Sequence, residues 1–122
     1  MIQGWTGVKE DWNHLPFQLL KEQNRAIITF DNRGIGQSQV KIAGKDTAAK
    51  PNENKGQPEF LLEDLCEDTH NLIAHVFKAK RCVHDKIDLL GFSMGGMIAQ
   101  KFLLKYPLLI RKIILLGTAP GK

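Results

Sequence analysis

The sequence of 122 residues has no apolar run long enough to cross a membrane and only two cysteines. A membrane-spanning helix needs about 20 consecutive apolar residues, so we expect no transmembrane segment. No basic start is followed by an apolar stretch, so we expect no signal peptide. Cys66 and Cys82 lack the spacing of a metal site or a disulfide framework. Reduced thiols are typical of cytoplasmic proteins, so we expect a cytoplasmic location and no bound metal.

Clustered positive charge is also missing. The formal net charge is +4, but the lysines and arginines are scattered along the chain. Proteins that bind nucleic acid usually gather these residues on one face, so we expect no nucleic-acid partner. The hydrophobic share of 43% and the charged share of 25% are those of an ordinary soluble domain. The length suffices for a single hydrophobic core.

Three short apolar runs indicate buried parallel strands, because each is rich in branched side chains and is followed by turn residues. Segments with helical periodicity alternate with these runs. The alternation predicts an α/β fold, a three-layer α/β/α sandwich with a mainly parallel sheet. The predicted strands are 26–30, 87–90 and 113–116, and the predicted helices are 13–23, from Leu61 to about Arg81, and 94–106.

Two details of this pattern are more specific. Asn13 is the expected N-cap of the first helix, which makes Pro16 acceptable in the first turn, where backbone amides are unpaired. Cys66 falls in the apolar stripe of the second helix, so we expect it to pack as a small hydrophobic residue. The polar stretch over residues 37–58 contains several glycines and prolines and predicts a long loop.

The most informative segment is Gly91-Phe92-Ser93-Met94-Gly95, which lies between a predicted strand and a predicted helix. Gly-x-Ser-x-Gly in this context is typical of a nucleophile elbow, a sharp turn that lifts a serine hydroxyl above the sheet. The glycines remove side chains that would clash in such a strained turn. The following helix points unpaired amides at the place where an oxyanion would form. The alternative is a glycine-rich turn without chemistry.

Four segments, in order, resemble the α/β-hydrolase family. Asp31-Asn32-Arg33-Gly34-Ile35-Gly36-Gln37-Ser38 resembles its D-x-R-G-x-G-x-S segment, and residues 91–99 resemble its elbow and the helix that follows. Tyr106-Pro107 and residues 113–118 resemble its next helix end and strand. Gln3-Gly4-Trp5 ahead of Asp11-Trp12 resembles its oxyanion-loop segment, where the family usually has His-Gly. The resemblance implies a truncated α/β-hydrolase core over residues 1–122, from strand three to strand six, without the first strands and the C-terminal Asp/His part.

The resemblance also implies roles for the matching residues. Ser93 would be the nucleophile, and the backbone amides of Met94 and Trp5 would form the oxyanion hole. Asp31 and Arg33 would be structural. No cofactor is implied, and the partner would be a small ester, lactone or amide substrate that passes through a covalent acyl intermediate. Serine at the elbow argues against the dehalogenase and epoxide-hydrolase branches, which need a carboxylate nucleophile.

The residues after Ser93 include no histidine, aspartate or glutamate, although in this family the triad acid and histidine follow the serine. The four histidines precede it. We expect His84 about 20 Å away at the opposite sheet edge, His70 and His75 on a helix surface, and His14 at the correct edge but out of reach. A serine without a base is a poor nucleophile, so we expect a fragment that is inactive as this chain alone.

Two other functions stay open. The resemblance implies that strand three lies between strands four and five of the sheet, and only Met1-Ile2-Gln3 match strand three. Strands 26–30 and 87–91 would then flank a gap with unpaired backbone groups. A catalytically silent remnant, or an interaction module that self-associates through exposed sheet edges, is therefore the alternative to a hydrolase. A nucleotide-binding Rossmann unit is disfavoured, because Gly34-Ile35-Gly36 lacks the third glycine and the helix start.

Overall fold

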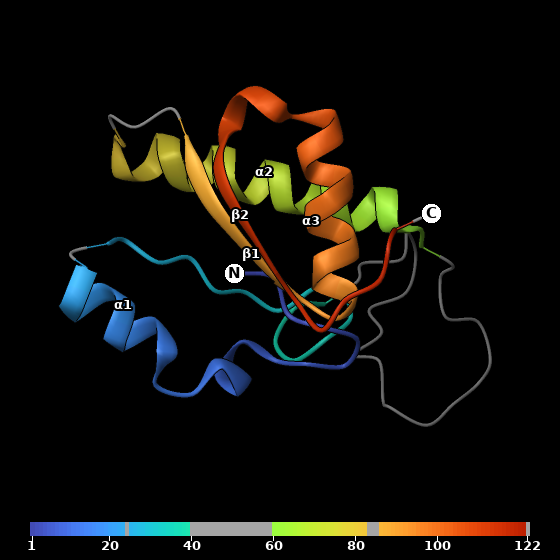
Figure 1. Ribbon diagram of the computed structural model, residues 1–122, viewed down its shortest axis with the longest axis horizontal. Helices are drawn as coiled ribbons and strands as arrows, with labels where there is room; N and C mark the ends of the chain where they lie inside the picture. The colour runs from blue at the N-terminus through green and yellow to red at the C-terminus, as the bar shows by residue number, and fades with distance from the viewer. Residues whose placement is uncertain (24, 40–59, 83–85, 122) are drawn as a thin grey trace.

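The structure is a computed structural model that describes residues 1–23, 25–39, 60–82 and 86–121. The predicted loop over residues 37–58 lies outside the described residues except for its first three positions. Figure 1 shows two adjacent strands with α2 and α3 beside them, while α1 lies apart at the lower left. The elements in chain order are η1 (Lys9–Trp12), α1 (Leu15–Gln23), α2 (Leu62–Lys80), β1 (Ile87–Phe92), α3 (Met94–Lys105), η2 (Pro107–Leu109) and β2 (Ile110–Leu116).

The sheet of the described residues consists of β1 and β2, which pair in parallel as the apolar runs predict. Leu89 lies opposite Ile113, and Phe92 lies opposite Leu116. On the other side of β1, Ile2 forms a parallel bridge with Gly91. The Ile2 amide donates to the Leu90 carbonyl at 2.8 Å, and the Phe92 amide donates to the Ile2 carbonyl at 3.0 Å. Residues 1–3 therefore continue the sheet beyond β1.

The prediction of a strand over residues 26–30 is wrong. This segment has no assigned strand structure, although it lies beside the first residues of the chain. The Met1 amino group donates to the Ile28 carbonyl at 2.8 Å, and the Asn32 side-chain amide donates to the Gln3 carbonyl at 3.1 Å. A ladder needs a partner of comparable length. The segment from Met1 to Gln3 fills the expected gap but is too short to give 26–30 a regular partner.

The helices match their predicted positions to within a few residues. The Leu61 amide donates to the Asp64 carboxylate at 2.8 Å at the start of α2, and Arg81 ends this helix with a left-handed φ of 50°. The predicted cap of α1 is wrong. Asn13 has a φ of 50° and its side chain bonds the Asp11 carbonyl, while the first helical bond runs from the Gln18 amide to the His14 carbonyl. The preceding 3-10 turn η1 takes up Asn13 and shifts the start of α1.

One hydrophobic core holds these elements together. The helix α3 packs against both strands, and α2 packs against α3. Cys66 packs there as a small hydrophobic residue, and burial raises the pKa of its thiol. Among the described residues no helix is long and apolar enough to span a bilayer. The buried apolar side chains of this core are Ile2, Leu65, Cys66, Ile73, Leu89, Ile98, Ala99 and Phe102.

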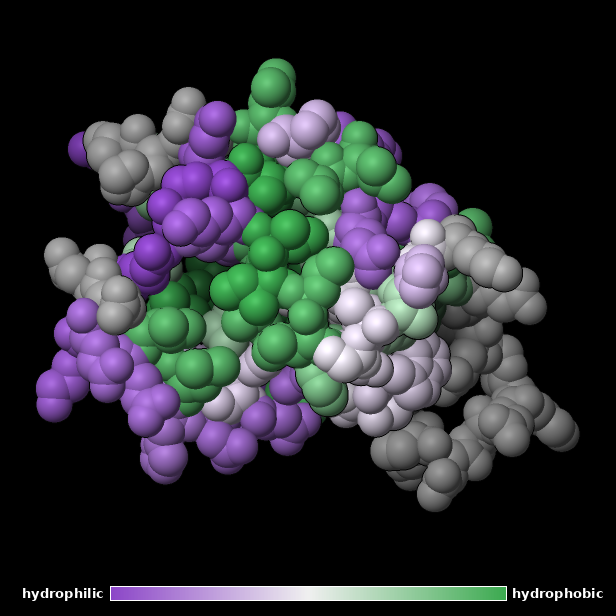
Figure 2. Space-filling view, viewed as in Figure 1, coloured by the Kyte–Doolittle hydropathy of each residue, from purple (hydrophilic) through white to green (hydrophobic). Residues whose placement is uncertain are grey.

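The opposite face of the two strands is open. Side chains alternate along a strand, so Phe92, Ile114 and Leu116 point away from the side on which Leu89 and Ile113 meet the core. These three side chains are 45%, 49% and 40% exposed. Figure 2 shows apolar surface gathered in the centre of this view of the molecule, over the two strands. The α/β class and the parallel sheet are as predicted.

Candidate active site

Ser93 occupies a sharp turn between β1 and α3. Its backbone has a φ of 53° and a ψ of −120°, a left-handed conformation that is strained for any residue with a side chain. Hydrogen bonds hold the turn on both sides. The Ser93 amide donates to the Leu116 carbonyl at 2.9 Å, and the Ser93 carbonyl accepts from the Gly96 amide at 2.9 Å and from the Thr118 hydroxyl at 2.6 Å. The surroundings therefore fix the strained conformation.

The glycines at positions 91 and 95 are required by close backbone approach. A Cβ atom on Gly91 would lie 2.3 Å from the Gly95 carbonyl oxygen, and one on Gly95 would lie 2.2 Å from the carbonyl oxygen of Ile2. Both distances are far below van der Waals contact. The first turn of α3 thus lies directly against β1 and the segment containing Ile2, which is the steric reason expected for the Gly-x-Ser-x-Gly pattern.

Two unpaired amides lie near this turn. Within the part of the chain that the structure describes, neither the Met94 amide nor the Trp5 amide donates a hydrogen bond. Met94 is the first residue of α3, where backbone amides lack helical partners. Gly4 brings the other loop close, since a Cβ atom there would lie 3.5 Å from the Ser93 hydroxyl oxygen. The Gly4 amide is already bonded to the Gln3 side chain at 3.0 Å, which leaves the next amide, that of Trp5, available.

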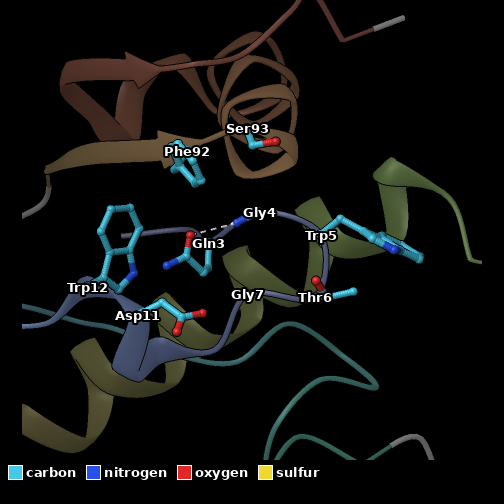
Figure 3. A pocket seen from close by; sticks show the side chains of 9 residues that line it. All are labelled: Gln3, Gly4, Trp5, Thr6, Gly7, Asp11, Trp12, Phe92 and Ser93. Carbon is cyan, nitrogen blue, oxygen red and sulfur yellow. Dashed lines mark hydrogen bonds between the residues drawn. The ribbon is translucent and has the colours of Figure 1, made fainter. Parts of the chain in front are cut away.

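A cleft of about 500 Å³ opens beside Ser93. Figure 3 shows Ser93 and Phe92 above it, Trp12 on one side, and the loop from Gly4 to Gly7 along the other. Its walls combine aromatic rings with polar groups, as small-molecule sites do. The described residues include no group of three His, Cys, Asp or Glu side chains that could hold a metal ion. The lining residues are Gln3, Gly4, Trp5, Thr6, Gly7, Asp11, Trp12, Phe92 and Ser93.

Asp31 connects the segment at Lys9 with the segment at Gln37, and it does not line the cleft. Its buried carboxylate accepts from the amide of Lys9 at 2.7 Å, the ammonium of Lys9 at 3.0 Å and the amide of Gln37 at 3.0 Å. Burial alone would raise the pKa of Asp31, but the hydrogen bonds and the Lys9 charge together hold that pKa below its ordinary value. These contacts match the structural role expected of Asp31.

Arg33 ties the same loop to α2. Its guanidinium donates to both carboxylate oxygens of Asp68, at 2.5 and 2.7 Å, and it also lies 5.9 Å from the centre of the Phe60 ring. A planar fork on a carboxylate fixes orientation as well as distance. Arg33 therefore orients the loop from residue 31 to residue 38 against the helix and has the structural role that was expected.

None of the described histidines lines the cleft. His70 stacks on Tyr106 with ring centres 4.1 Å apart, at the C-terminal end of α3. Ser93 lies at the other end of this 12-residue helix, about 18 Å away at 1.5 Å per residue, so His70 is not a base for Ser93 in this structure. His14 and His75 are exposed. His84 lies outside the described residues, and with it the prediction made for that residue.

Trp12 is a further functional candidate, to which the resemblance of its segment to the oxyanion loop assigned no role. Its side chain is 8% exposed and lines the cleft, and its indole nitrogen has no hydrogen-bond partner in the described structure. The signals in the sequence are its place in that segment and a large aromatic residue within a strongly polar stretch, Lys9-Glu10-Asp11-Trp12-Asn13-His14. Such a residue is commonly buried, but the sequence does not indicate that it faces a site.

Several known proteins are similar to this chain in sequence or in fold. A protein of Bacillus subtilis, provisionally named 2-succinyl-6-hydroxy-2,4-cyclohexadiene-1-carboxylate synthase, is 28% identical over 120 residues, 98% of this chain and 36% of the relative. The proline iminopeptidase PfmaB of Pestalotiopsis fici is 30% identical over 95 residues, 78% of this chain and 27% of the relative. The chain therefore spans about a third of the length of these curated relatives.

A solved structure has a fold similar to that of this chain. The structure titled "Est816 as an N-Acyl homoserine lactone degrading enzyme" superposes with a TM-score of 0.64 and 21% identity, over 96% of this chain and 36% of that one. The family profile described as the alpha/beta hydrolase fold matches residues 1–122, the whole chain. The chain belongs to the α/β-hydrolase family.

Proposed function

We propose that this chain contributes the nucleophile and the oxyanion hole of a serine hydrolase that acts on small ester, lactone or amide substrates. The observation that carries the proposal is the strained turn at Ser93, which places a serine hydroxyl at the cleft beside two unpaired amides. Strain of this kind persists where the surroundings impose it and is frequent at active sites. The remaining assignments depend on this turn.

In the proposed reaction the Ser93 oxygen attacks the substrate carbonyl and gives its proton to a general base. The amides of Met94 and Trp5 donate hydrogen bonds to the oxyanion of the tetrahedral intermediate. The protonated base then gives this proton to the leaving oxygen or nitrogen, the intermediate collapses to an alcohol or amine, and an acyl group stays on Ser93. A water molecule, deprotonated by the same base, then attacks this acyl group, releases the acid and restores the serine hydroxyl.

The general base is the part that the described residues do not supply. No described histidine lines the cleft, and residues 94–122 contain no histidine or acidic residue. We therefore propose that this chain alone is inactive at neutral pH, because an isolated serine hydroxyl is a poor nucleophile. Two of the printed names fit this substrate class, a proline iminopeptidase and an N-acyl homoserine lactone degrading enzyme, whereas the Bacillus subtilis relative is named a synthase.

Reaction with a fluorophosphonate probe tests this proposal. The chain should not be labelled at pH 7, and added imidazole, which acts as a soluble base, should cause labelling of Ser93. Intact-mass and peptide mass spectrometry would locate the label, and the Ser93→Ala variant is the matched control. Labelling that persists in Ser93→Ala, or no labelling of the wild-type chain in imidazole at alkaline pH, would contradict the assignment of Ser93.

Self-association is the second candidate function, and the open side of β2 favours it. Among the described residues β2 pairs only with β1, and its side chains from Ile114 to Leu116 are exposed. We propose a second copy of the chain as the partner, with the two β2 strands antiparallel about Ile113. Arg111 and Lys112 of one copy would then face Leu115 and Ile114 of the other, so that no like charges meet.

Sedimentation velocity tests the association. Ile114→Lys would place a lysine opposite Lys112 twice in the symmetric pair, so it should convert a dimer to a monomer. Leu104→Lys, at an 83% exposed position on α3, is the matched control and should leave the dimer intact. A wild-type chain that sediments as a monomer at every concentration would exclude this function.

We also propose a cytoplasmic location, because both cysteines are unpaired thiols; subcellular fractionation would check it.

A further inference from the structure

The cleft beside Ser93 contains a buried donor that no described residue satisfies. Trp12 is 8% exposed, its indole nitrogen is fully buried, and that nitrogen has no partner among the described residues. A buried polar group without a hydrogen bond costs about 1–3 kcal/mol. In native structures such a group is usually satisfied by ordered water, an ion or a ligand, or it serves a function. Trp12 lines the cleft, and in Figure 3 its indole nitrogen lies on the edge of the ring that faces Gln3.

A second donor faces the same space. Gln3 is 5% exposed and lines the cleft, and its side-chain oxygen accepts from the Gly4 amide at 3.0 Å. This bond fixes which end of the amide is oxygen and turns the NH₂ group away from Gly4. Within the described chain the NH₂ group donates to no protein acceptor. In Figure 3 the side-chain nitrogens of Gln3 and Trp12 point toward the same part of the cleft.

We propose that Gln3 and Trp12 form a hydrogen-bonding subsite for a second, uncharged carbonyl oxygen of the substrate, distinct from the carbonyl that Ser93 attacks. A carbonyl oxygen has two lone pairs and so accepts from both donors at once. The carboxylate of Asp11 also lines the cleft, and it opposes an anionic group there. This inference rests on the proposed function and narrows its substrates to acyl compounds with an additional amide or ketone carbonyl.

The two tryptophans make this subsite observable. The chain has only Trp5 and Trp12, so a ¹⁵N-labelled sample gives two indole N–H signals, which the Trp5→Phe variant assigns. The probe is N-acetylglycine methyl ester, which carries an ester and a second uncharged carbonyl. Methyl butyrate, which has the ester alone, is the matched control ligand. We expect the Trp12 signal to shift saturably with the first compound and to stay in place with the second.

Variants separate this subsite from the nucleophile. Trp12→Phe keeps an aromatic ring but removes the N–H, and it should weaken binding of N-acetylglycine methyl ester about fivefold, the effect of one hydrogen bond to an uncharged acceptor. The backbone signals of Gly4 and Gly7 report binding in this variant and show that it is folded. Ser93→Ala should give the same Trp12 shift as the wild-type chain, so failure of the subsite and failure of the Ser93 assignment are distinguishable.

Three results would overturn the inference. The Trp12 signal could stay in place up to the solubility limit of the dicarbonyl ester, or it could move equally with methyl butyrate. Trp12→Phe could bind the ester as tightly as the wild-type chain. A water molecule that holds the indole N–H would give the first result together with a nuclear Overhauser contact to water, and would show that the donor is satisfied by solvent alone.

Discussion

Replacing Gly95 by alanine has two opposing effects on stability: alanine favours the helix, but its Cβ atom would overlap the backbone at Ile2. Gly95 lies in the first turn of α3, and glycine-to-alanine changes within helices ordinarily stabilise by about 0.5–1 kcal/mol. In this fold the new Cβ atom would lie 2.2 Å from the Ile2 carbonyl oxygen and 2.7 Å from that of Gln3, where ordinary contact begins at 3.4 Å. Both neighbours are backbone atoms, so no side-chain rotation relieves the overlap.

The expected loss in free energy of unfolding depends on how far the added Cβ atom displaces the backbone of Ile2. Residue Ile2 is held to β1 by hydrogen bonds of 2.8 and 3.0 Å, and a shift of roughly 1 Å breaks or lengthens both. Each bond contributes about 1 kcal/mol, and overpacking adds about 1–3 kcal/mol. After subtraction of the helix preference, the expected loss in free energy of unfolding is about 2–4 kcal/mol. Local propensity alone predicts the opposite sign.

Urea denaturation followed by circular dichroism measures this difference, with the slope m as a check that the transition stays comparable. Gly121→Ala is the matched control, because its Cβ atom would lie 3.1 Å from the nearest atom and needs only a small adjustment. We expect that variant to stay within about 0.5 kcal/mol of the wild-type chain. A Gly95→Ala chain as stable as the wild type, or more stable, would refute the contact between α3 and the segment at Ile2.

Three other predictions concern the turn and its loops. Ser93→Gly should raise the free energy of unfolding by about 1 kcal/mol, since glycine adopts a φ of 53° without strain, whereas Ser93→Ala should not; urea midpoints compare them. Asp31→Asn should cost about 2 kcal/mol at pH 7. Because the folded pKa of Asp31 is lowered, its contribution is complete above the ordinary value of 3.8 and is lost as the pH falls through the folded pKa. The wild-type midpoint should thus fall more steeply below about pH 4 than that of Asp31→Asn, and parallel curves would contradict this. Arg33→Lys should lose about 0.5–1 kcal/mol, with little coupling to Asp68→Asn left in a double-mutant cycle, because a lysine cannot bind both carboxylate oxygens and the pair is partly exposed.

The sequence predicts well those elements whose signal is local. The helix that begins at Leu62 and the one that begins at Met94 have clear apolar periodicity and identifiable ends, and both lie where the pattern predicts them. The turn at Ser93 is also predictable, because its glycines and flanking elements lie within a few residues. The segment 26–30 has the composition of a strand, but strand structure depends on a partner, and a sequence pattern does not contain the length of that partner.

In the candidate site too, features with a local sequence signal were predictable and features that depend on distant residues were not. Gly4 and Ser93 come from distant parts of the chain, and only their motifs made it predictable that they lie together. The unpaired indole of Trp12 could not be predicted, because a missing hydrogen bond is a property of everything that surrounds an atom. The start of α1 was misplaced for a similar reason, since the 3-10 turn before it rests on the contact between the Lys9 amide and Asp31.

The bridge between Ile2 and Gly91 has a consequence for how this protein is made. The ribosome adds about 5–20 residues per second, so the early segment waits roughly 5–20 s for the strand that it joins. During that interval the apolar side chain of Ile2 has no native partner, and the α3 turn that packs on its carbonyl does not yet exist. The serine turn therefore assembles only after the residues of β1 and α3 have been synthesised, and chaperones that bind nascent chains have time to shield the segment at Ile2 before it occurs.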